Sequence, residues 1–175
     1  ALWSLGVDTE LFKPSRTNCL SSLPRPVLIY VGRIAVEKNL EAFLSLPVGG
    51  TKVVVGDGPA RAQLEKMFPE VKFVGEKHGQ ELADHYAAGD VFVFPSKTDT
   101  FGLVLLEALA CGTPVAAFPV TGPLDVITDS KVGVLDEDLE QAVTQALTLK
   151  RQDCRAFAIK ASWESCARAL SHNLG

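Results

Sequence analysis

Residues 27–59, VLIYVGRIAVEKNLEAFLSLPVGGTKVVVGDGP, carry the clearest indication of the fold class. This stretch opens with five apolar residues, Val27–Val31, and holds a second apolar run at 52–55, and a glycine closes each run. Between them, apolar residues recur at helical spacing over 37–46. Continuous apolar runs this short are typical of strands that are buried on both faces. The stretch therefore predicts a strand, a helix and a second strand parallel to the first.

The same alternation continues along the rest of the chain. Four further apolar runs predict strands, at 71–74, 90–94, 114–118 and 132–135. Segments with helical spacing or capping residues predict helices, at 59–67, 81–88, 103–110, 138–149, 154–161 and 163–171. Strands that alternate with helices imply right-handed crossovers between parallel strands. We therefore expect an α/β fold, a Rossmann-like doubly wound parallel sheet of about six strands with helices on both faces.

The domain organisation is predicted from the length of the chain and from the positions of glycine and proline. A chain of 175 residues fits one domain. Residues 1–26 contain Gly6 and three prolines, so we expect a linker or an extended lead-in there, with residues 27–175 forming the domain. The chain begins without Met and shows no basic segment followed by an apolar one. This predicts no signal peptide, and either a processed start or a fragment of a longer protein.

Composition and charge exclude several classes of protein. With 47% hydrophobic and 22% charged residues, the chain resembles an ordinary globular protein rather than a disordered one. Its net charge of −4 and its lack of a basic block argue against binding to nucleic acid. The longest apolar stretch, 101–120, carries Glu107 and Pro114 and is therefore a poor membrane span. We expect a soluble, cytoplasmic protein.

Cysteine and histidine spacing predicts no metal site. The cysteines form no Cys-x-x-Cys pair, and they are too few for a disulfide scaffold. We expect all four to be reduced and most of them buried: Cys19, Cys111, Cys154 and Cys166. We place His85 on a helix surface rather than in the role of a general base. Cys111 is interpreted as a small buried residue near a helix end rather than as a nucleophile.

The loops that follow the predicted strands carry residues suited to an anion. In a doubly wound sheet, ligands bind outside the carboxyl ends of the strands. Four of these loops hold glycines or cations: 32–39, 56–59, 75–77 and 95–102. Glycine lets the backbone approach a ligand, helix N-termini present N–H groups, and Arg and Lys neutralise phosphate. A glycine after one strand is an ordinary turn residue, but the coincidence across four loops predicts a phosphate or nucleotide site.

Common nucleotide motifs are incomplete or absent. Gly56-x-Gly58 is half of a dinucleotide fingerprint, with Arg61 where the third glycine would stand, so NAD is not expected. The sequence contains no P-loop and no Gly-x-Ser-x-Gly elbow. The acidic run 136–138 resembles a metal–nucleotide ligand, but Asp138 stands where the following helix needs an N-cap. We interpret Asp138 as that cap.

Glu107 lies in an otherwise apolar predicted helix, where burial of an unpaired carboxylate is costly. A carboxylate only accepts hydrogen bonds, so the vicinal diol of a ribose would satisfy both of its oxygens. An internal Arg or Lys would satisfy it equally well. The position of Glu107 alone does not separate these two interpretations.

Several segments carry a family resemblance. The segment PSKTDTFGLVLLEALACGTPVAA (95–117), with its Asp99-x7-Glu107 spacing, resembles the Glu-x7-Glu signature of retaining glycosyltransferases of family 4, which have the GT-B architecture. Other segments resemble that family in the same order: GVDTELF (6–12), YVGRIAVEKNL (30–40), VVVGDGP (53–59), VKFVGEK (71–77) and SWESCARAL (162–170). The resemblance covers nearly the whole chain.

This resemblance implies that the chain is the C-terminal, donor-binding half of a larger enzyme. The donor would be a UDP- or GDP-sugar, and the glycosyl group would pass with retention to an acceptor hydroxyl of a lipid or a sugar. The acceptor would be held by an N-terminal domain that this chain lacks. The full-length protein would be cytoplasmic or peripheral at the inner face of a membrane. No metal or other cofactor is expected, because basic side chains can stabilise the diphosphate.

The resemblance also assigns roles to residues. Arg33 and Lys38 would hold the donor diphosphate, Glu107 would bind the ribose hydroxyls, and Asp99 would lie near the donor sugar; these four form the implied catalytic set. Amides at the start of the helix would bind the distal phosphate, and loop residues would flank the base. These donor-binding residues are Gly32, Gly56, Gly58, Gly75, Lys77, Phe101, Gly102, Leu103 and Val104. The family more often has Glu where this chain has Asp99, and the shorter side chain alters either the contact to the sugar or the sugar preference.

Two other functions stay open. A sugar-nucleotide isomerase or epimerase of related architecture would convert a donor without any acceptor, although its catalytic carboxylates have no assignment in this sequence. A non-catalytic nucleotide-binding domain would bind a donor and never turn it over. Product analysis with a donor alone distinguishes the first of these from a transferase.

Overall fold

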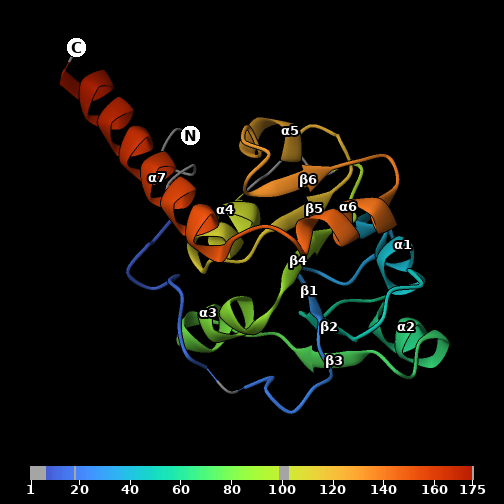
Figure 1. Ribbon diagram of the computed structural model, residues 1–175. Helices are drawn as coiled ribbons and strands as arrows, with labels where there is room; N and C mark the ends of the chain where they lie inside the picture. The colour runs from blue at the N-terminus through green and yellow to red at the C-terminus, as the bar shows by residue number, and fades with distance from the viewer. Residues whose placement is uncertain (1–6, 18, 99–102, 175) are drawn as a thin grey trace.

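Six strands form one parallel sheet in the order β3-β2-β1-β4-β5-β6 (Figure 1). The computed structural model describes residues 7–17, 19–98 and 103–174, and the side chains among them as far as residue 162. The strands are β1 (Val27–Val31), β2 (Thr51–Val55), β3 (Lys72–Gly75), β4 (Val91–Phe94), β5 (Val115–Ala117) and β6 (Gly133–Leu135). Each predicted strand is present, with bounds shifted by a residue at most at either end, so the doubly wound parallel sheet is confirmed.

Helices cover both faces of this sheet. They are α1 (Leu40–Leu44), α2 (Arg61–Met67), α3 (Gly79–Ala88), α4 (Leu103–Ala110), α5 (Pro123–Val126), α6 (Leu139–Ala146) and α7 (Arg151–Leu174), with a 3₁₀ turn, η2 (Val36–Lys38), before α1. α3, α4 and α7 pack on one face, and α1, α2 and α6 pack on the other.

The strand side chains alternate between these two faces. In β1, Val27 and Ile29 pack with α3 and α4, whereas Leu28 and Tyr30 pack with α1 and α6. Successive side chains of a strand point to opposite faces, so a strand with helices on both sides is apolar at every position. This explains the continuous apolar runs of the sequence.

The helix predicted at 37–46 begins later in the structure, because α1 starts at Leu40. The chain forms η2, then Asn39 adopts a left-handed conformation with a φ of 58°, and only then does α1 begin. Asn is one of the few residues that tolerate this conformation. Its Nδ2 donates a 3.0 Å hydrogen bond to the carbonyl oxygen of Pro95, after β4. A contact with a distant loop thus interrupts a segment whose local pattern is helical.

The C-terminal helix is longer than predicted. α7 is one helix of 24 residues, whereas the sequence pattern predicts two, at 154–161 and 163–171. No glycine or proline stands between Arg151 and Leu174, so nothing in the chain ends the helix between the two segments. Figure 1 shows α7, in red, extending past the sheet. Neither α7 nor any other described helix is long and apolar enough to cross a membrane.

The lead-in before β1 contains no helix or strand in its described part, 7–17 and 19–26. It is nevertheless packed against the domain. Phe12 is buried among residues of α3 and α4, and its ring meets that of Tyr86 edge to face, with the centroids 5.8 Å apart. The division of the chain at residue 26 stays a prediction.

Arg155 of α7 holds the lead-in in place. Its guanidinium donates hydrogen bonds of 2.8 Å and 3.0 Å to the carbonyl oxygens of Phe12 and Thr9. A third hydrogen bond, of 3.0 Å, reaches the carbonyl oxygen of Ala110 at the end of α4. One side chain thus joins the lead-in, α4 and α7.

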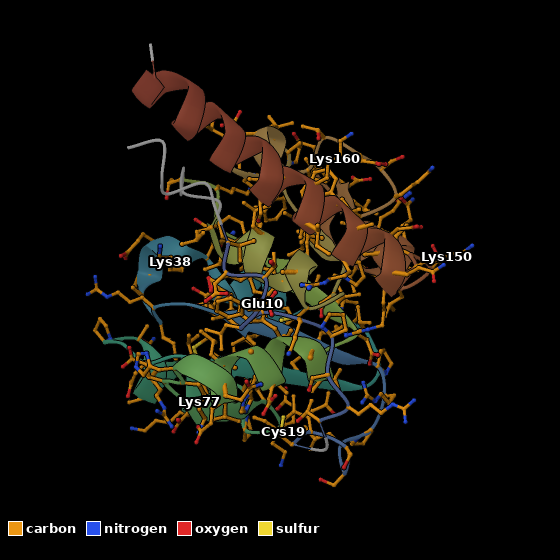
Figure 2. The ribbon with its side chains drawn as sticks, turned by 90° about the vertical axis from the view of Figure 1, so that its left-hand side faces the viewer. Glu10, Cys19, Lys38, Lys77, Lys150 and Lys160 are labelled. Atoms are coloured by element: carbon orange, nitrogen blue, oxygen red, sulfur yellow. The ribbon has the colours of Figure 1, made fainter. Side chains whose placement is uncertain are left out.

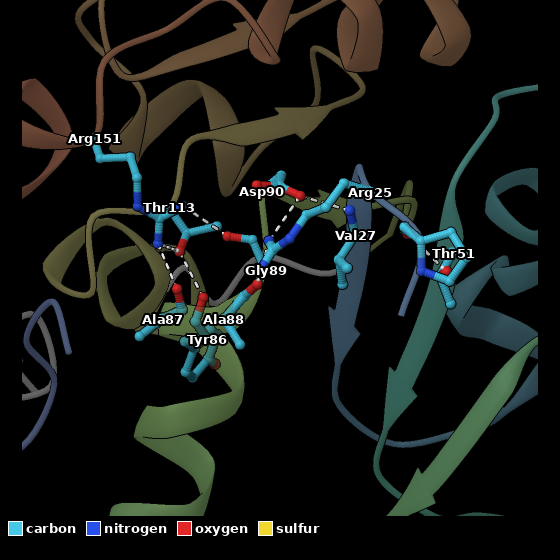
Figure 3. A network of polar contacts seen from close by, with 11 residues as sticks. Arg25, Val27, Thr51, Tyr86, Ala87, Ala88, Gly89, Asp90, Thr113 and Arg151 are labelled. Carbon is cyan, nitrogen blue, oxygen red and sulfur yellow. Dashed lines mark hydrogen bonds and ion pairs between the residues drawn. The ribbon is translucent and has the colours of Figure 1, made fainter. Parts of the chain in front are cut away.

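The C-terminus of α3 is capped by side chains from three distant segments (Figure 3). Its last carbonyl groups have no partner within the helix. Thr113 donates a 2.6 Å hydrogen bond to the carbonyl oxygen of residue 86. Arg151 donates two, of 2.6 Å to the carbonyl oxygen of residue 87 and of 2.7 Å to that of residue 89. Arg25 donates one of 3.0 Å to the carbonyl oxygen of residue 88. These contacts fasten α3 to the amino-terminal edge of the sheet.

The surroundings of His85 differ from the prediction, and those of the described cysteines agree with it. His85 is buried rather than on a helix surface, and its Nδ1 lies 2.7 Å from the carbonyl oxygen of Glu81. This backbone contact gives the ring nitrogen a partner, so the imidazole can be buried. Cys111 and Cys154 are buried free thiols, as predicted, but Cys19 is exposed because it belongs to the lead-in and not to the layered core.

Candidate functional site

The strand order has a switch point between β1 and β4. These strands are neighbours, yet the chain leaves β1 for α1 on one face of the sheet and leaves β4 for α4 on the other. At such a point a crevice opens at the carboxyl ends of the strands. A cavity of about 250 Å³ lies there, lined by Tyr30, Val31, Gly32, Lys38, Phe94, Ser96 and Val104.

Three of the predicted donor-binding residues line this cavity. Gly32 and Lys38 come from the loop after β1, and Val104 comes from the first turn of α4. Sequence reasoning missed the other four lining residues, because the side-chain direction at a strand end depends on a register that the apolar pattern does not give. These residues are Tyr30, Val31, Phe94 and Ser96. Their position at the end of a central strand is the signal that could have found them.

The loop after β1 is folded tightly over the strand end. Gly32 N donates to the carbonyl oxygen of Val55 at 3.0 Å, and Tyr30 Oη donates to that of Arg33 at 2.8 Å. Gly32 has a φ of 151°, and a Cβ there would lie 2.8 Å from Tyr30 Oη, so the loop favours glycine. This arrangement holds the backbone of Arg33, whose exposed side chain does not line the cavity.

Asn39 joins the two walls of the cavity. Its hydrogen bond to Pro95 links the loop after β1 to the loop after β4. Lys38 immediately precedes Asn39, Ser96 immediately follows Pro95, and both Lys38 and Ser96 line the cavity. The Asn39–Pro95 hydrogen bond therefore constrains where these two polar side chains lie.

The glycines after β2 and β3 bring three neighbouring loops into backbone contact. Gly56 N donates a 2.9 Å hydrogen bond to the carbonyl oxygen of Gly75. A Cβ on Gly56 would lie 1.9 Å from the oxygen of Gly32, and one on Gly58 would lie 2.2 Å from that of Ile34. Loop packing is therefore sufficient to require Gly56 and Gly58. Their place beside a nucleotide base stays a prediction.

Lys77 lies on the same side of the molecule as Lys38, and Lys150 lies on the opposite side (Figure 2). The Nζ of Lys77 is 3.6 Å from the carboxylate of Glu81 in the first turn of α3. Neither Lys77 nor Gly75 lines the cavity. The loops after β1 and β3 thus place cations at one edge of the sheet, but only Lys38 reaches the cavity.

The first turn of α4 borders the cavity, because Val104 lines it. The first N–H groups of a helix have no intrahelical partner, and this end of the helix favours anions. The predicted residues Asp99, Phe101 and Gly102 lie outside the described residues.

Glu107 lies one turn further along α4, on the side of Val104. It is half-buried, and burial raises the pKa of its carboxyl from 4.5 to about 7. Within the part of the chain that the structure describes, no ion pair or hydrogen bond involves its side chain. The internal Arg or Lys partner that the sequence left open is thus not found there, and the carboxylate is available to a ligand.

The acidic run 136–138 serves local structure. Asp138 Oδ1 accepts a 3.3 Å hydrogen bond from the backbone N of Gln141 and caps α6, as predicted. Asp136 Oδ1 accepts one of 2.8 Å from the backbone N of Asp138. Over the described residues, no group of three or more His, Cys, Asp or Glu side chains could hold a metal ion.

Residues 25–151 match a protein-family model described as glycosyl transferases group 1. Sulfoquinovosyl transferase SQD2 of Arabidopsis thaliana is 42% identical over 167 residues, which covers 85% of this chain and 32% of that protein. A GDP-mannose-dependent alpha-mannosyltransferase of Mycobacterium tuberculosis is 41% identical over 140 residues, which covers 76% of this chain and 37% of that protein.

A solved structure is similar over nearly the whole chain. Sucrose-phosphate synthase from Thermosynechococcus elongatus matches with a TM-score of 0.82 and 27% identity, over 97% of this chain and 50% of that one. The chain thus spans about a third to a half of the length of these proteins. The region that matches the family model contains all six strands of the sheet and every residue that lines the cavity. The chain belongs to the glycosyl transferases group 1 family.

Proposed function

We propose that this chain is the donor-binding domain of a glycosyltransferase and that it binds a UDP- or GDP-sugar at the carboxyl ends of β1 and β4. The observation that carries the proposal is the cavity at this switch point, where Gly32, Lys38 and the first turn of α4 meet. Family membership supports a glycosyl donor as the ligand. The name of the mannosyltransferase relative, which is GDP-mannose-dependent, supports a sugar nucleotide.

The diphosphate of the donor would meet several positive groups. Lys38 lines the cavity, Arg33 extends from the same loop, and the first turn of α4, with its N–H groups, borders the cavity. When the bond between the sugar and the diphosphate breaks, negative charge builds on the departing diphosphate. Groups that are already in place stabilise this charge without reorganising. In this proposal no divalent metal takes part.

Glu107 would bind the two hydroxyls of the ribose. Its side chain lies on the same side of α4 as Val104, one turn beyond the cavity wall. A diol donates two hydrogen bonds, and a carboxylate without another partner accepts both. Ligand binding would thereby satisfy a group whose burial is otherwise costly.

The rest of the proposal concerns the full-length protein. The reaction would retain the anomeric configuration, as in family 4, with Asp99 near the donor sugar. A domain preceding this chain would hold the acceptor, a lipid or a sugar. The greater length of the relatives supports this domain, because the chain covers 32% of one and 37% of the other. We place the protein in the cytoplasm or at the inner face of a membrane.

Titration calorimetry of the chain with UDP, GDP and their sugars tests the proposal. We expect at least one nucleotide to bind, and we expect Lys38→Met to weaken its binding at low salt more than at high salt. Lys150→Met is the matched control, because Lys150 lies on the opposite side of the molecule. Failure of every nucleotide to bind the folded chain would contradict the proposal.

Product analysis of the full-length protein separates a transferase from the alternatives. A transferase needs an acceptor before the sugar leaves the nucleotide. Conversion of the sugar nucleotide to an isomer with no acceptor present would indicate an epimerase instead. Tight binding with no conversion under any condition would indicate a non-catalytic domain.

A further inference from the structure

Two buried side-chain hydroxyls have no hydrogen-bond partner in the described part of the chain, those of Ser96 and Tyr86. Tyr86 packs between aromatic rings, 5.8 Å from that of Phe12 and 5.7 Å from that of Phe92. Ser96 is 1% exposed and lines the cavity at the switch point. Only the Ser96 hydroxyl therefore belongs to the candidate site.

The surroundings of Ser96 explain why its hydroxyl is not satisfied by the protein. Ser96 follows Pro95, whose carbonyl oxygen already accepts from Asn39. Phe94 and Val104, which also line the cavity, have apolar side chains and offer the Ser96 hydroxyl no partner. A buried hydroxyl without a partner is costly, so its retention at this place points to a partner that enters the cavity.

The chemistry of the cavity wall limits what that partner can be. Among the described lining residues, Lys38 is the one that carries a charge, and this charge is positive. The first turn of α4 adds N–H groups near Val104. No carboxylate belongs to the described lining. A cation and hydrogen-bond donors together require a ligand group that accepts hydrogen bonds and carries negative charge.

We propose that the Ser96 hydroxyl donates a hydrogen bond to a phosphate oxygen of the bound nucleoside diphosphate, beside Lys38 and the first turn of α4. This inference rests on the proposed function and adds to it a binding residue. Ser96 holds the leaving diphosphate from the β4 side, whereas Lys38 holds it from the β1 side. The Asn39–Pro95 hydrogen bond fixes these two sides relative to each other.

Ser96→Ala tests this directly, because it removes one oxygen atom and no side-chain hydrogen bond among the described residues. We expect the ligand-free variant to unfold at the same temperature as the wild type or at a higher one. We expect its affinity for UDP or GDP, whichever binds the wild type, to fall about tenfold or more, since hydrogen bonds to charged groups are the strong ones. Affinity for the matching nucleoside, uridine or guanosine, should not change.

Ser45→Ala is the matched control. Ser45 follows α1, is exposed, and donates a 2.6 Å hydrogen bond to the carbonyl oxygen of Glu41. Its replacement should leave nucleotide affinity unchanged.

The outcomes separate this inference from the proposed function. If the wild type binds neither UDP nor GDP, the proposed function fails. If the wild type binds and Ser96→Ala binds equally tightly, the proposed function stands and the role of Ser96 is overturned. A lower unfolding temperature of ligand-free Ser96→Ala, with unchanged affinity, would make the hydroxyl structural. Weaker binding of the sugar nucleotide but not of the diphosphate would assign Ser96 to the sugar and overturn the phosphate contact.

Discussion

At the scale of a single residue, the burial of Glu107 disfavours the charged form of its carboxyl group. Burial raises the pKa of its carboxyl from 4.5 to about 7, so between these two pH values the folded chain keeps a proton that the unfolded chain has lost. The free energy of unfolding should therefore fall as the pH rises from about 4.5 to about 7 and should then level off. Urea unfolding at several pH values measures this.

Glu107→Gln supplies the comparison for this pH dependence. The variant has no titrating group at the position, so its free energy of unfolding should exceed that of the wild type by about 1–3 kcal/mol at pH 8 and by little at pH 4.5. Equal stabilities of the two proteins at both pH values would show that Glu107 titrates normally.

The same residue should link nucleotide binding to pH with the opposite sign. A ribose diol favours the charged carboxylate, so binding should release a proton and the affinity should rise between pH 6 and pH 8. Glu107→Gln should bind the nucleotide about 1–3 kcal/mol more weakly at pH 8. The difference between the two proteins is the quantity to measure, because the phosphate of the ligand also titrates near pH 6. If the difference in affinity between the wild type and Glu107→Gln does not vary with pH, Glu107 does not bind the ribose.

Part of the site could be predicted from the sequence, because the segments that follow predicted strands carry residues suited to an anion. Gly32, Lys38 and Val104 line the cavity as predicted. Ser96 stands just after a central strand, but this position alone does not distinguish it from other loop residues. What distinguishes it is that its hydroxyl is buried without a partner among the described residues, which a sequence does not show. The burial of His85 could not be predicted, because the contact of its ring with the carbonyl oxygen of Glu81 does not show in a sequence.

At the scale of elements, the Asn39–Pro95 hydrogen bond connects two loops that belong to different crossovers. Asn39→Gly keeps the left-handed conformation and loses the hydrogen bond, so it should cost about 1 kcal/mol of stability. Asn39→Ala loses both and should cost about 2–3 kcal/mol. Both variants should weaken nucleotide binding, since Lys38 is adjacent to residue 39. Chemical denaturation and calorimetry give the two quantities, and an Asn39→Ala variant as stable as the wild type would contradict the expectation.

The capping of α3 provides a second expectation at this scale. Arg151→Met leaves two carbonyl oxygens, those of Ala87 and Gly89, without their donors. The loss of stability should be about 1–3 kcal/mol, and nucleotide affinity should not change because this end of α3 lies at the amino-terminal edge of the sheet. Lys150→Met, at the exposed neighbouring position, should cost less than about 0.5 kcal/mol. If chemical denaturation shows similar losses of stability for both variants, Arg151 does not stabilise the end of α3.

Strands were easier to predict than helices for a physical reason. A strand buried on both faces is apolar at every position, so its ends coincide with the ends of an apolar run, as in Val27–Val31. Helix ends depend on contacts elsewhere. The hydrogen bond of Asn39 separates η2 from α1, and α5 has only four residues, too few for a periodic pattern.

At the scale of the whole molecule, the chain should fold alone, bind a nucleotide sugar weakly and transfer no sugar. Both faces of the sheet are covered by helices within this chain, which is sufficient for a stable core. In the proposed function a second domain would form the other wall of the cleft, so within these 175 residues water should screen each phosphate contact. The proposed acceptor-holding domain lies outside these 175 residues, so we expect no acceptor to be held near the anomeric carbon. A cooperative unfolding transition and a transfer assay test this, and sugar transfer by the 175-residue chain would refute the half-enzyme interpretation.

The contacts of Arg155 have a consequence for how this region varies among related proteins. All three of its hydrogen bonds described above end on main-chain oxygen atoms, those of Thr9, Phe12 and Ala110. Every amino acid supplies such an oxygen, so the three partners can be exchanged for other residues without removing an acceptor. Lysine has one nitrogen and cannot reproduce the forked contact of a guanidinium. An alignment of related chains should therefore show a constant arginine opposite variable positions, and paired substitutions would not reveal the contact.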